Sequence, residues 1–191
     1  MNIFKLKQFI FVGLCILLFA EYGYCGFRAT IHAEGEYIGG QNQADVVFGI
    51  GPHEIQKKKI PVSPGYSCDM AISDPATWEH LKEWIQAIGQ AQYIWLIQFD
   101  PHGDAKPETV PRTSTMSWNP DEFGPGSVEL RGISFNQQGK LVPADLIADM
   151  KKVTSYSLTD TMAYHPFVII YKPDYLTEII KTLQLLTNFK E

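Results

Sequence analysis

Cysteine, basic clusters and catalytic signatures are scarce in this chain. Three of its 191 residues are cysteines and none forms a Cys-x-x-Cys pair, which argues against c-type haem attachment, dithiol redox chemistry and paired-cysteine zinc sites. The formal net charge is −5 and the longest basic run is Lys57–Lys59, so no nucleic-acid partner is expected. The sequence also lacks Gly-x-Ser-x-Gly and His-Glu-x-x-His motifs, which removes two common hydrolase signatures.

Long apolar runs are also rare, and the clearest one lies near the start of the chain. Lys5 and Lys7 precede the apolar segment Phe9–Ala20, and Gly23-Tyr24-Cys25 supplies small residues at a cleavage point. The pattern predicts a signal peptide over residues 1–25 and a secreted or periplasmic protein, including display at the cell surface. Two alternatives stay open: lipidation of Cys25, and a retained segment that serves as an N-terminal membrane anchor.

Cleavage after Cys25 would leave one domain over residues 26–191, which carries the single cysteine Cys68. The removed segment contains two lysines and one glutamate, so the formal charge moves from −5 to −6. A domain with one thiol has no internal disulfide, and its stability must come from burial. Cys68 is expected to be a small buried residue, with an intermolecular thiol as the alternative.

Alternating apolar residues predict a mainly β domain. Residues 27–33 and 45–50 are typical of two strands joined by a glycine-rich turn. Residues 93–99 form the strongest strand, with β-branched and aromatic side chains on both faces, and belong at the centre of a sheet. The Pro- and Gly-rich residues 51–67 are expected to form a long loop. Further strands are expected at residues 113–118, 127–132, 152–158 and 167–171.

Three- and four-residue apolar spacing predicts one or two helices beside these strands. Residues 75–90 follow Asp74 with this spacing, and a strand over 83–88 is the alternative. A shorter helix is expected over residues 144–151. After Pro173, a C-terminal amphipathic helix is expected, which packs on its own domain or docks on a partner. Its apolar stripe consists of Leu176, Ile179, Ile180, Leu183 and Leu186.

Short aromatic strands next to turns recur in a set order along the chain. They are Val47–Ile50, Ile60-Pro61, Trp95–Ile97, Ser117–Pro120, Asp149-Met150 with Ser155-Tyr156, and Phe167–Tyr171. This order resembles the immunoglobulin-like β-sandwich modules of bacterial exported surface proteins. The resemblance implies an antiparallel β-sandwich over residues 26–191 and a role in binding, display or assembly. The segment 75–90 and the C-terminal helix depart from a simple module.

A turn directly after the central strand carries the best candidate metal ligands. Asp100, His102 and Asp104 lie there, and oxygen ligands on such a turn could hold Ca²⁺, although the two carboxylates could equally cap turn amides. A zinc site would need His102, Asp104 and His165 to converge from strand ends. These four residues carry the second functional hypothesis, a small metal-dependent hydrolase. No other cofactor is expected.

Aromatic residues supply the candidate binding surface. Trp78, Trp84 and Trp118 could stack on a sugar or contact a protein if exposed, and Asp121 lies in a turn beside Trp118. Core packing is the alternative for each ring. The preferred hypothesis is therefore a non-enzymatic exported protein that binds an envelope or extracellular protein or glycan, through a strand edge or the terminal helix. Contact with a membrane is expected only if residues 1–25 are retained.

Overall fold

The computed structural model describes residues 26–37, 40–52, 56–59, 70–74, 77, 79–99, 111–160, 165–175 and 180. The expected signal peptide over residues 1–25 and Cys68 lie outside these residues. The described chain is mainly β, as the alternation predicts. Its strands are β1 (Phe27–Tyr37), β2 (Gly40–Gly51), β3 (Gln56–Lys59), β4 (Met70–Ser73), β5 (His80–Ala87), β6 (Tyr93–Phe99), β7 (Arg112–Trp118), β8 (Gly126–Phe135), β9 (Leu141–Asp149), β10 (Ser155–Asp160) and β11 (His165–Pro173).

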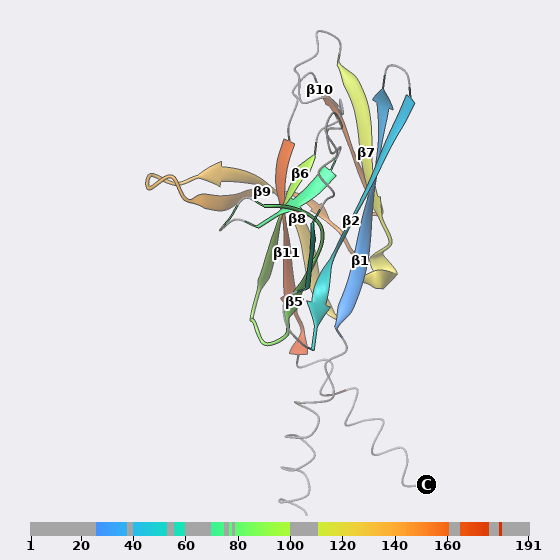
Figure 1. The fold of residues 1–191 in the computed structure, drawn as a ribbon. Helices are drawn as coiled ribbons and strands as arrows, with labels where there is room; N and C mark the ends of the chain where they lie inside the picture. Colours follow the sequence, from blue (N-terminus) through green and yellow to red (C-terminus); the bar gives the residue numbers. More distant parts are fainter. Residues whose placement is uncertain are drawn as a thin grey trace, which may run out of the picture.

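All of these strands belong to one sheet that curls until it is nearly closed into a barrel (Figure 1). The order across the sheet is β10-β7-β1-β2-β5-β4-β6-β11-β8-β9, and β3 pairs with β5 away from this path. The predicted hairpin is confirmed, because β1 and β2 pair in antiparallel register from Phe27↔Ile50 onward. The β2–β5 pair is parallel, so the expectation of a purely antiparallel arrangement is wrong at that pair.

Strand β5 joins the two halves of the sheet. Leu81 pairs with both β3 and β4, and Glu83 pairs with both β3 and β2. A strand residue has one partner on each edge, so β2 and β4 share the edge opposite β3. The β10-β7-β1-β2 half therefore gives way to the β4-β6-β11-β8-β9 half along a single strand.

The predicted central strand is confirmed as β6, with the same bounds, Tyr93–Phe99. It lies between β4 and β11, and both of its faces are covered. One face contributes Trp95 to the main core, where its Nε1–H donates to the Trp84 carbonyl at 3.1 Å. The other face contributes Leu96 to a smaller apolar cluster with Val168 and Ile170 of β11.

Aromatic rings fill the interior of the curled sheet. Phe27 lies 4.8 Å from Tyr171 and Phe48 lies 5.0 Å from Trp95, measured between ring centroids, and both pairs meet edge to face. Edge-to-face pairs add about 1 kcal/mol each beyond their area burial. β1 and β2 approach so closely here that a Cβ on Gly49 would lie 2.0 Å from the Phe27 carbonyl oxygen.

Trp118 ties the two ends of the sheet together at the turn that follows β9, a set of contacts that we call the Trp118 seam. The Trp118 backbone N–H donates to the Thr154 carbonyl at 2.9 Å. Its indole Nε1–H lies 2.9 Å from the Met150 carbonyl oxygen and 2.8 Å from that of Val153. Met150 N–H in turn donates to the Val128 carbonyl at 2.9 Å. One side chain thus connects β7 to the end of the β8–β9 hairpin.

Three expectations for local structure are wrong. Residues 80–87 of the expected helix 75–90 form strand β5, because pairing with β2, β3 and β4 outweighs the local spacing. The alternative of a strand over 83–88 agrees with β5 at residues 83–87. The expected helix over 144–151 is instead the end of β9 and the turn after it. Within the expected loop 51–67, residues 56–59 form β3. Most of the expected C-terminal helix lies outside the described residues.

Candidate interaction surface

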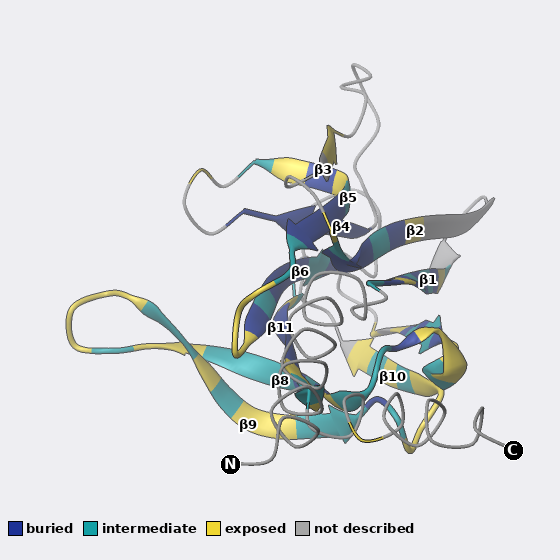
Figure 2. Cartoon of the chain, turned by 90° about the horizontal axis from the view of Figure 1, so that it is seen from below, coloured by how far each residue is buried: buried dark blue, intermediate teal, exposed yellow. Residues whose placement is uncertain are grey.

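The β8–β9 hairpin leaves the curled sheet as a projecting arm, defined here as residues 131–146. Figure 1 shows it extending away from the other strands, and Figure 2 shows it as intermediate or exposed along its whole length. The ladder between β8 and β9 runs from Glu129↔Asp149 to Phe135↔Leu141. The far part of this hairpin therefore lies beyond the core and depends on its own pairing.

The tip of the arm is tightly hydrogen-bonded although it buries little. Asn136 N–H donates to the Lys140 carbonyl at 3.0 Å, and Gly139 N–H donates to the Asn136 carbonyl at 2.9 Å. The Asn136 side-chain oxygen accepts from the backbone N–H of Gln138 at 3.0 Å and of Lys140 at 2.9 Å. Gly139 has φ +71°, a conformation that favours glycine. The turn therefore holds the two strands in one register.

The root of the arm is braced by one arginine at an irregular part of the ladder. The register shifts on both sides of Arg131. Its Nε–H donates to Glu129 at 2.7 Å, and Nη1–H donates to the Ala144 carbonyl across the ladder at 3.1 Å. Ile133, and Leu141 on the last rung of the ladder, pack against the smaller apolar cluster of β6 and β11. These contacts fix the direction in which the arm leaves the sheet.

Among the described residues, the two large apolar side chains with the highest exposed fractions lie on this arm. Phe135 is 60% exposed and Leu146 is 52% exposed, whereas the aromatic side chains of the main core are buried. Aromatic side chains are enriched at protein-binding surfaces, so the exposed Phe135 makes the arm a candidate interaction surface. The arm offers no cluster of titratable groups, so the chemistry it supports is apolar contact and backbone hydrogen bonding.

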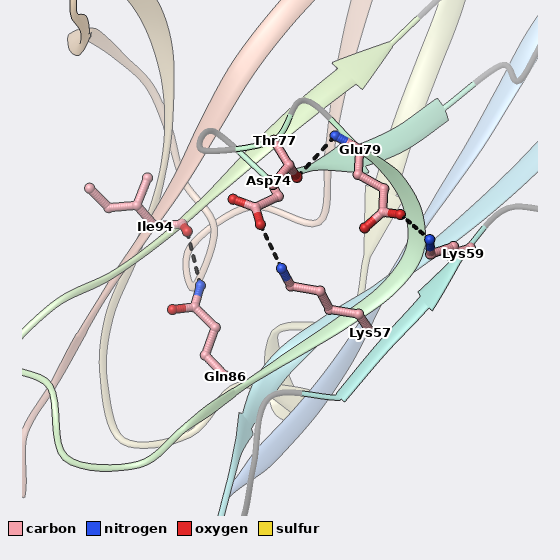
Figure 3. A network of polar contacts seen from close by, with 7 residues as sticks. All are labelled: Lys57, Lys59, Asp74, Thr77, Glu79, Gln86 and Ile94. Atoms are coloured by element: carbon pink, nitrogen blue, oxygen red, sulfur yellow. Dashed lines mark hydrogen bonds and ion pairs between the residues drawn. The ribbon is translucent and has the colours of Figure 1, made fainter.

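A second candidate site is the polar network around β3, drawn in Figure 3. Lys57 Nζ lies 2.5 Å from Asp74 Oδ2 and 5.2 Å from the centroid of the Trp84 ring. Lys59 Nζ lies 2.5 Å from Glu79 Oε1. Each lysine is thus neutralised by a neighbouring carboxylate. The network ties the short edge strand β3 to the segment after β4.

Two buried polar atoms near this network have no hydrogen-bond partner among the described residues, Trp84 Nε1 and Ser73 Oγ. Gln86 is satisfied, because its side-chain N–H donates to the Ile94 carbonyl at 3.0 Å (Figure 3). The two lysines drawn in the network, Lys57 and Lys59, are each paired with a carboxylate, that of Asp74 or of Glu79. We therefore regard the network as a structural brace for β3.

A charged triplet lies on the outer surface of β1 and β2. His32 Nδ1 lies 2.6 Å from Asp45 Oδ1, and Nε2 lies 3.1 Å from Glu34 Oε1. The hydrogen bond to Asp45 is the largest cause that raises the pKa of His32 above its usual 6.5, and burial opposes it. No group of three His, Cys, Asp or Glu side chains among the described residues is arranged to hold a metal ion.

The structure buries two of the tryptophans proposed for binding. Trp84 and Trp118 are 7% and 6% exposed, so neither offers an open ring face for sugar stacking. Trp118 is held by the seam described above, and Trp84 is covered on one face by Lys57. Asp121 is exposed in the short 3₁₀ turn Pro120–Glu122, where its N–H donates to the Asn119 side chain at 3.1 Å.

Of the remaining candidate site residues, the structure describes only His165. Trp78, Asp100, His102 and Asp104 lie outside the described residues, so their convergence with His165 stays a prediction. His165 begins β11 and stacks on Phe167 at 6.3 Å between ring centroids. No helix in the described part of the chain is long and apolar enough to cross a membrane.

The sequence patterns do not predict the arm. They indicate a strand over residues 127–132, but they indicate a helix over 144–151, where part of its partner strand lies. The sequence signal for the arm is Asn136-Gln-Gln-Gly139, a turn-forming run between two alternating segments.

Comparison with protein-family models, with curated proteins and with solved structures found no match to this chain.

Proposed function

We propose that this chain is an exported, non-enzymatic binding protein that engages a protein partner through the β8–β9 arm. The observation that carries the proposal is the exposure of Phe135 and Leu146 on a hairpin that is otherwise rigidly built. Ordering a hairpin costs conformational entropy, and this hairpin regains little of it through core burial. A binding role for its surface would explain why its turn and root are nonetheless held by hydrogen bonds.

The chemistry of the arm favours a protein over a glycan. Sugar recognition usually combines an aromatic face with several polar groups that point at the same hydroxyls. Around Phe135 the neighbouring side chains Ile133 and Leu141 are apolar, and Leu146 lies further along the same hairpin. Aromatic anchors surrounded by aliphatic residues are typical of the centres of protein interfaces.

Two further parts of the proposal concern the fold and the location. The immunoglobulin-like sandwich is supported by the way in which β5 divides the sheet into two halves that share one core. Export is supported by the basic, apolar and small-residue order of residues 1–25. The C-terminal amphipathic helix after Asp174 remains part of the same proposal.

Site-specific photo-crosslinking in cells that export the protein tests the arm directly. A photoreactive phenylalanine analogue placed at Phe135 is expected to give one adduct of defined mass, because the side chain faces the partner. The same analogue at Ser127, an exposed position of β8 outside the arm, is the matched control and is expected to give none.

Competition makes the result specific. Excess wild-type protein should suppress the adduct, whereas excess protein with Phe135→Ser and Leu146→Ser should not. The proposal is wrong if position 135 gives no adduct, if position 127 gives an equal one, or if both competitors suppress it equally.

A further inference from the structure

Three strands of the described sheet pair on one edge only, and they differ in how that edge is protected. β3 carries Lys57–Lys59 and a bulge between its last two lysines. β9 carries Pro143, and the ladder that it forms with β8 shifts register twice. Charges, proline and bulges are the devices by which natural sheets prevent strand addition.

The third such strand, β10, has none of these devices along Ser155–Thr159. Within the described residues it pairs only with β7, in regular register from Ser155↔Ser117 to Asp160↔Arg112. Figure 1 shows it beside β7, and it stands at one end of the strand order. An uninterrupted edge of this kind presents backbone donors and acceptors to any strand that can match its faces.

The two faces of β10 have different chemistry. Its outer face carries only hydroxyls, from Ser155, Ser157 and Thr159, all exposed. Its inner face carries Tyr156 and Leu158, which are half-buried and pack against the main core. Any added strand must therefore offer hydroxyl or other small polar groups outside and apolar groups inside.

The sequence of β10 meets that requirement itself, because Ser-Tyr-Ser-Leu-Thr has the same pattern in both directions from Ser157. A two-fold axis perpendicular to the sheet would place β10 of one copy antiparallel to β10 of a second copy. The outer faces of the two strands would then lie on the same side of the joined sheet. Ser157 would then face Ser157 of the second copy, and Ser155 would face its Thr159. On the inner face, Tyr156 would face Leu158 of the second copy, an aromatic–aliphatic pair that stabilises antiparallel strands.

The same hydroxyl pairing is already present on the other edge of β10. The hydroxyls of Thr113 and Thr159 are hydrogen-bonded at 2.8 Å, and so are those of Thr115 and Ser157. A hydroxyl has one donor and two acceptor sites, so those of β10 keep capacity for a second neighbour. The β7–β10 ladder thus provides the template for a further strand of identical outer chemistry.

We propose that two copies of this chain associate in antiparallel fashion through the β10 edge, with the two-fold axis at Ser157. This interface is separate from the β8–β9 arm and does not depend on it. Six residues span about 20 Å of strand, which is short for a stable interface. We therefore expect a weak dimer, with a dissociation constant on the order of 100 µM.

Sedimentation equilibrium on the purified protein, over a concentration range that spans this value, tests the proposal. Ser157→Lys brings two lysines together at the axis and should weaken association at least tenfold, as should Ser157→Glu. An equimolar mixture of the two variants should restore the dimer, because opposite charges then meet at the axis. This rescue also shows that both variants are folded. Ser134→Lys, an exposed position of the arm, is the matched control and should associate like wild type.

Other results overturn the proposal. A chain that remains monomeric throughout the range has no such interface. Unchanged association of Ser157→Lys, or no recovery in the mixture, places the interface elsewhere. Equal loss in Ser157→Lys and Ser134→Lys assigns the effect to general charge repulsion, and association lost only in Ser134→Lys assigns it to the arm.

Discussion

The curled sheet and the β8–β9 arm use the same kind of strand but bury different things. In the sheet, Trp95 and Phe48 are fully covered, and their contacts stabilise the whole domain. In the arm, Phe135 is mostly exposed, and order comes from the Asn136 turn and from Arg131. If the arm binds a partner as proposed, stability and recognition are carried by separate parts of one sheet. Substitutions should therefore divide into those that change unfolding and those that change binding.

The largest expected effect separates two aromatic residues. Trp95→Ala removes a fully buried ring and its hydrogen bond to the Trp84 carbonyl, and should lower the free energy of unfolding by about 3–5 kcal/mol. Phe135→Ala should change it by less than about 0.5 kcal/mol, because that ring is mainly in solvent. Chemical denaturation of both variants measures the contrast. Equal losses would show that the arm is part of the core.

Two glycines extend the contrast to the backbone. Gly49→Ala places a Cβ 2.0 Å from the Phe27 carbonyl oxygen, so β1 and β2 must separate, at a cost of about 3 kcal/mol. At Gly139 a Cβ meets nothing within 4 Å, and only the positive φ opposes alanine, at about 1 kcal/mol. In thermal unfolding, the melting temperature of Gly49→Ala should be well below that of Gly139→Ala. The reverse order would contradict the close approach of the two strands.

The seam at Trp118 should show an intermediate effect. Trp118→Phe keeps most of the buried ring but removes the Nε1–H that lies near the Met150 and Val153 carbonyls. The loss should be about 1–2 kcal/mol. Hydrogen exchange should localise it to the turn after β9, with the β1–β2 amides unaffected. Uniformly faster exchange would mean that the seam is not a separate unit.

The smallest expected effect is pH-dependent. The pKa of His32 is raised in the folded protein by Asp45 and Glu34, so the stabilisation is fully present below about pH 6.5 and is lost as the pH rises through the folded-state value. The free energy of unfolding of wild type should exceed that of His32→Gln by about 0.5 kcal/mol near pH 5.5, since exposed ion pairs are weak. Chemical denaturation at pH 5.5 and 8.5 measures this difference, which should be smaller near pH 8.5. A gap that widens with pH would contradict the assignment.

Sequence patterns predicted the strands that bury a face. The alternation in β1 and the two apolar faces of β6 leave little choice of structure, and their expected positions are confirmed. For β5 the sequence leaves a helix over 75–90 and a strand over 83–88 both open, because Leu81 and Trp84 have helical spacing. Only pairing with three distant strands decides in favour of the strand. Such pairing is non-local and leaves no mark in a short window of sequence.

The candidate site was harder to predict than the fold. Tryptophan rings bind many ligands but also fill cores, and the sequence does not distinguish the two uses for Trp84 and Trp118. The sequence does not predict the exposure of the arm, because exposure depends on what the rest of the chain leaves uncovered. Phe135 resembles any strand residue until the hairpin is placed in space.

Comparing the Phe135→Ser, Leu146→Ser double variant with wild type tests the central claim, that the arm is a binding element which the fold does not need. We predict a free energy of unfolding within about 1 kcal/mol of wild type. We also predict that a photoreactive probe at Gln138, in the turn of the arm, gives at least tenfold less partner adduct in the double variant than in the wild-type background. Full retention of that adduct, or unfolding of the variant, would contradict the account.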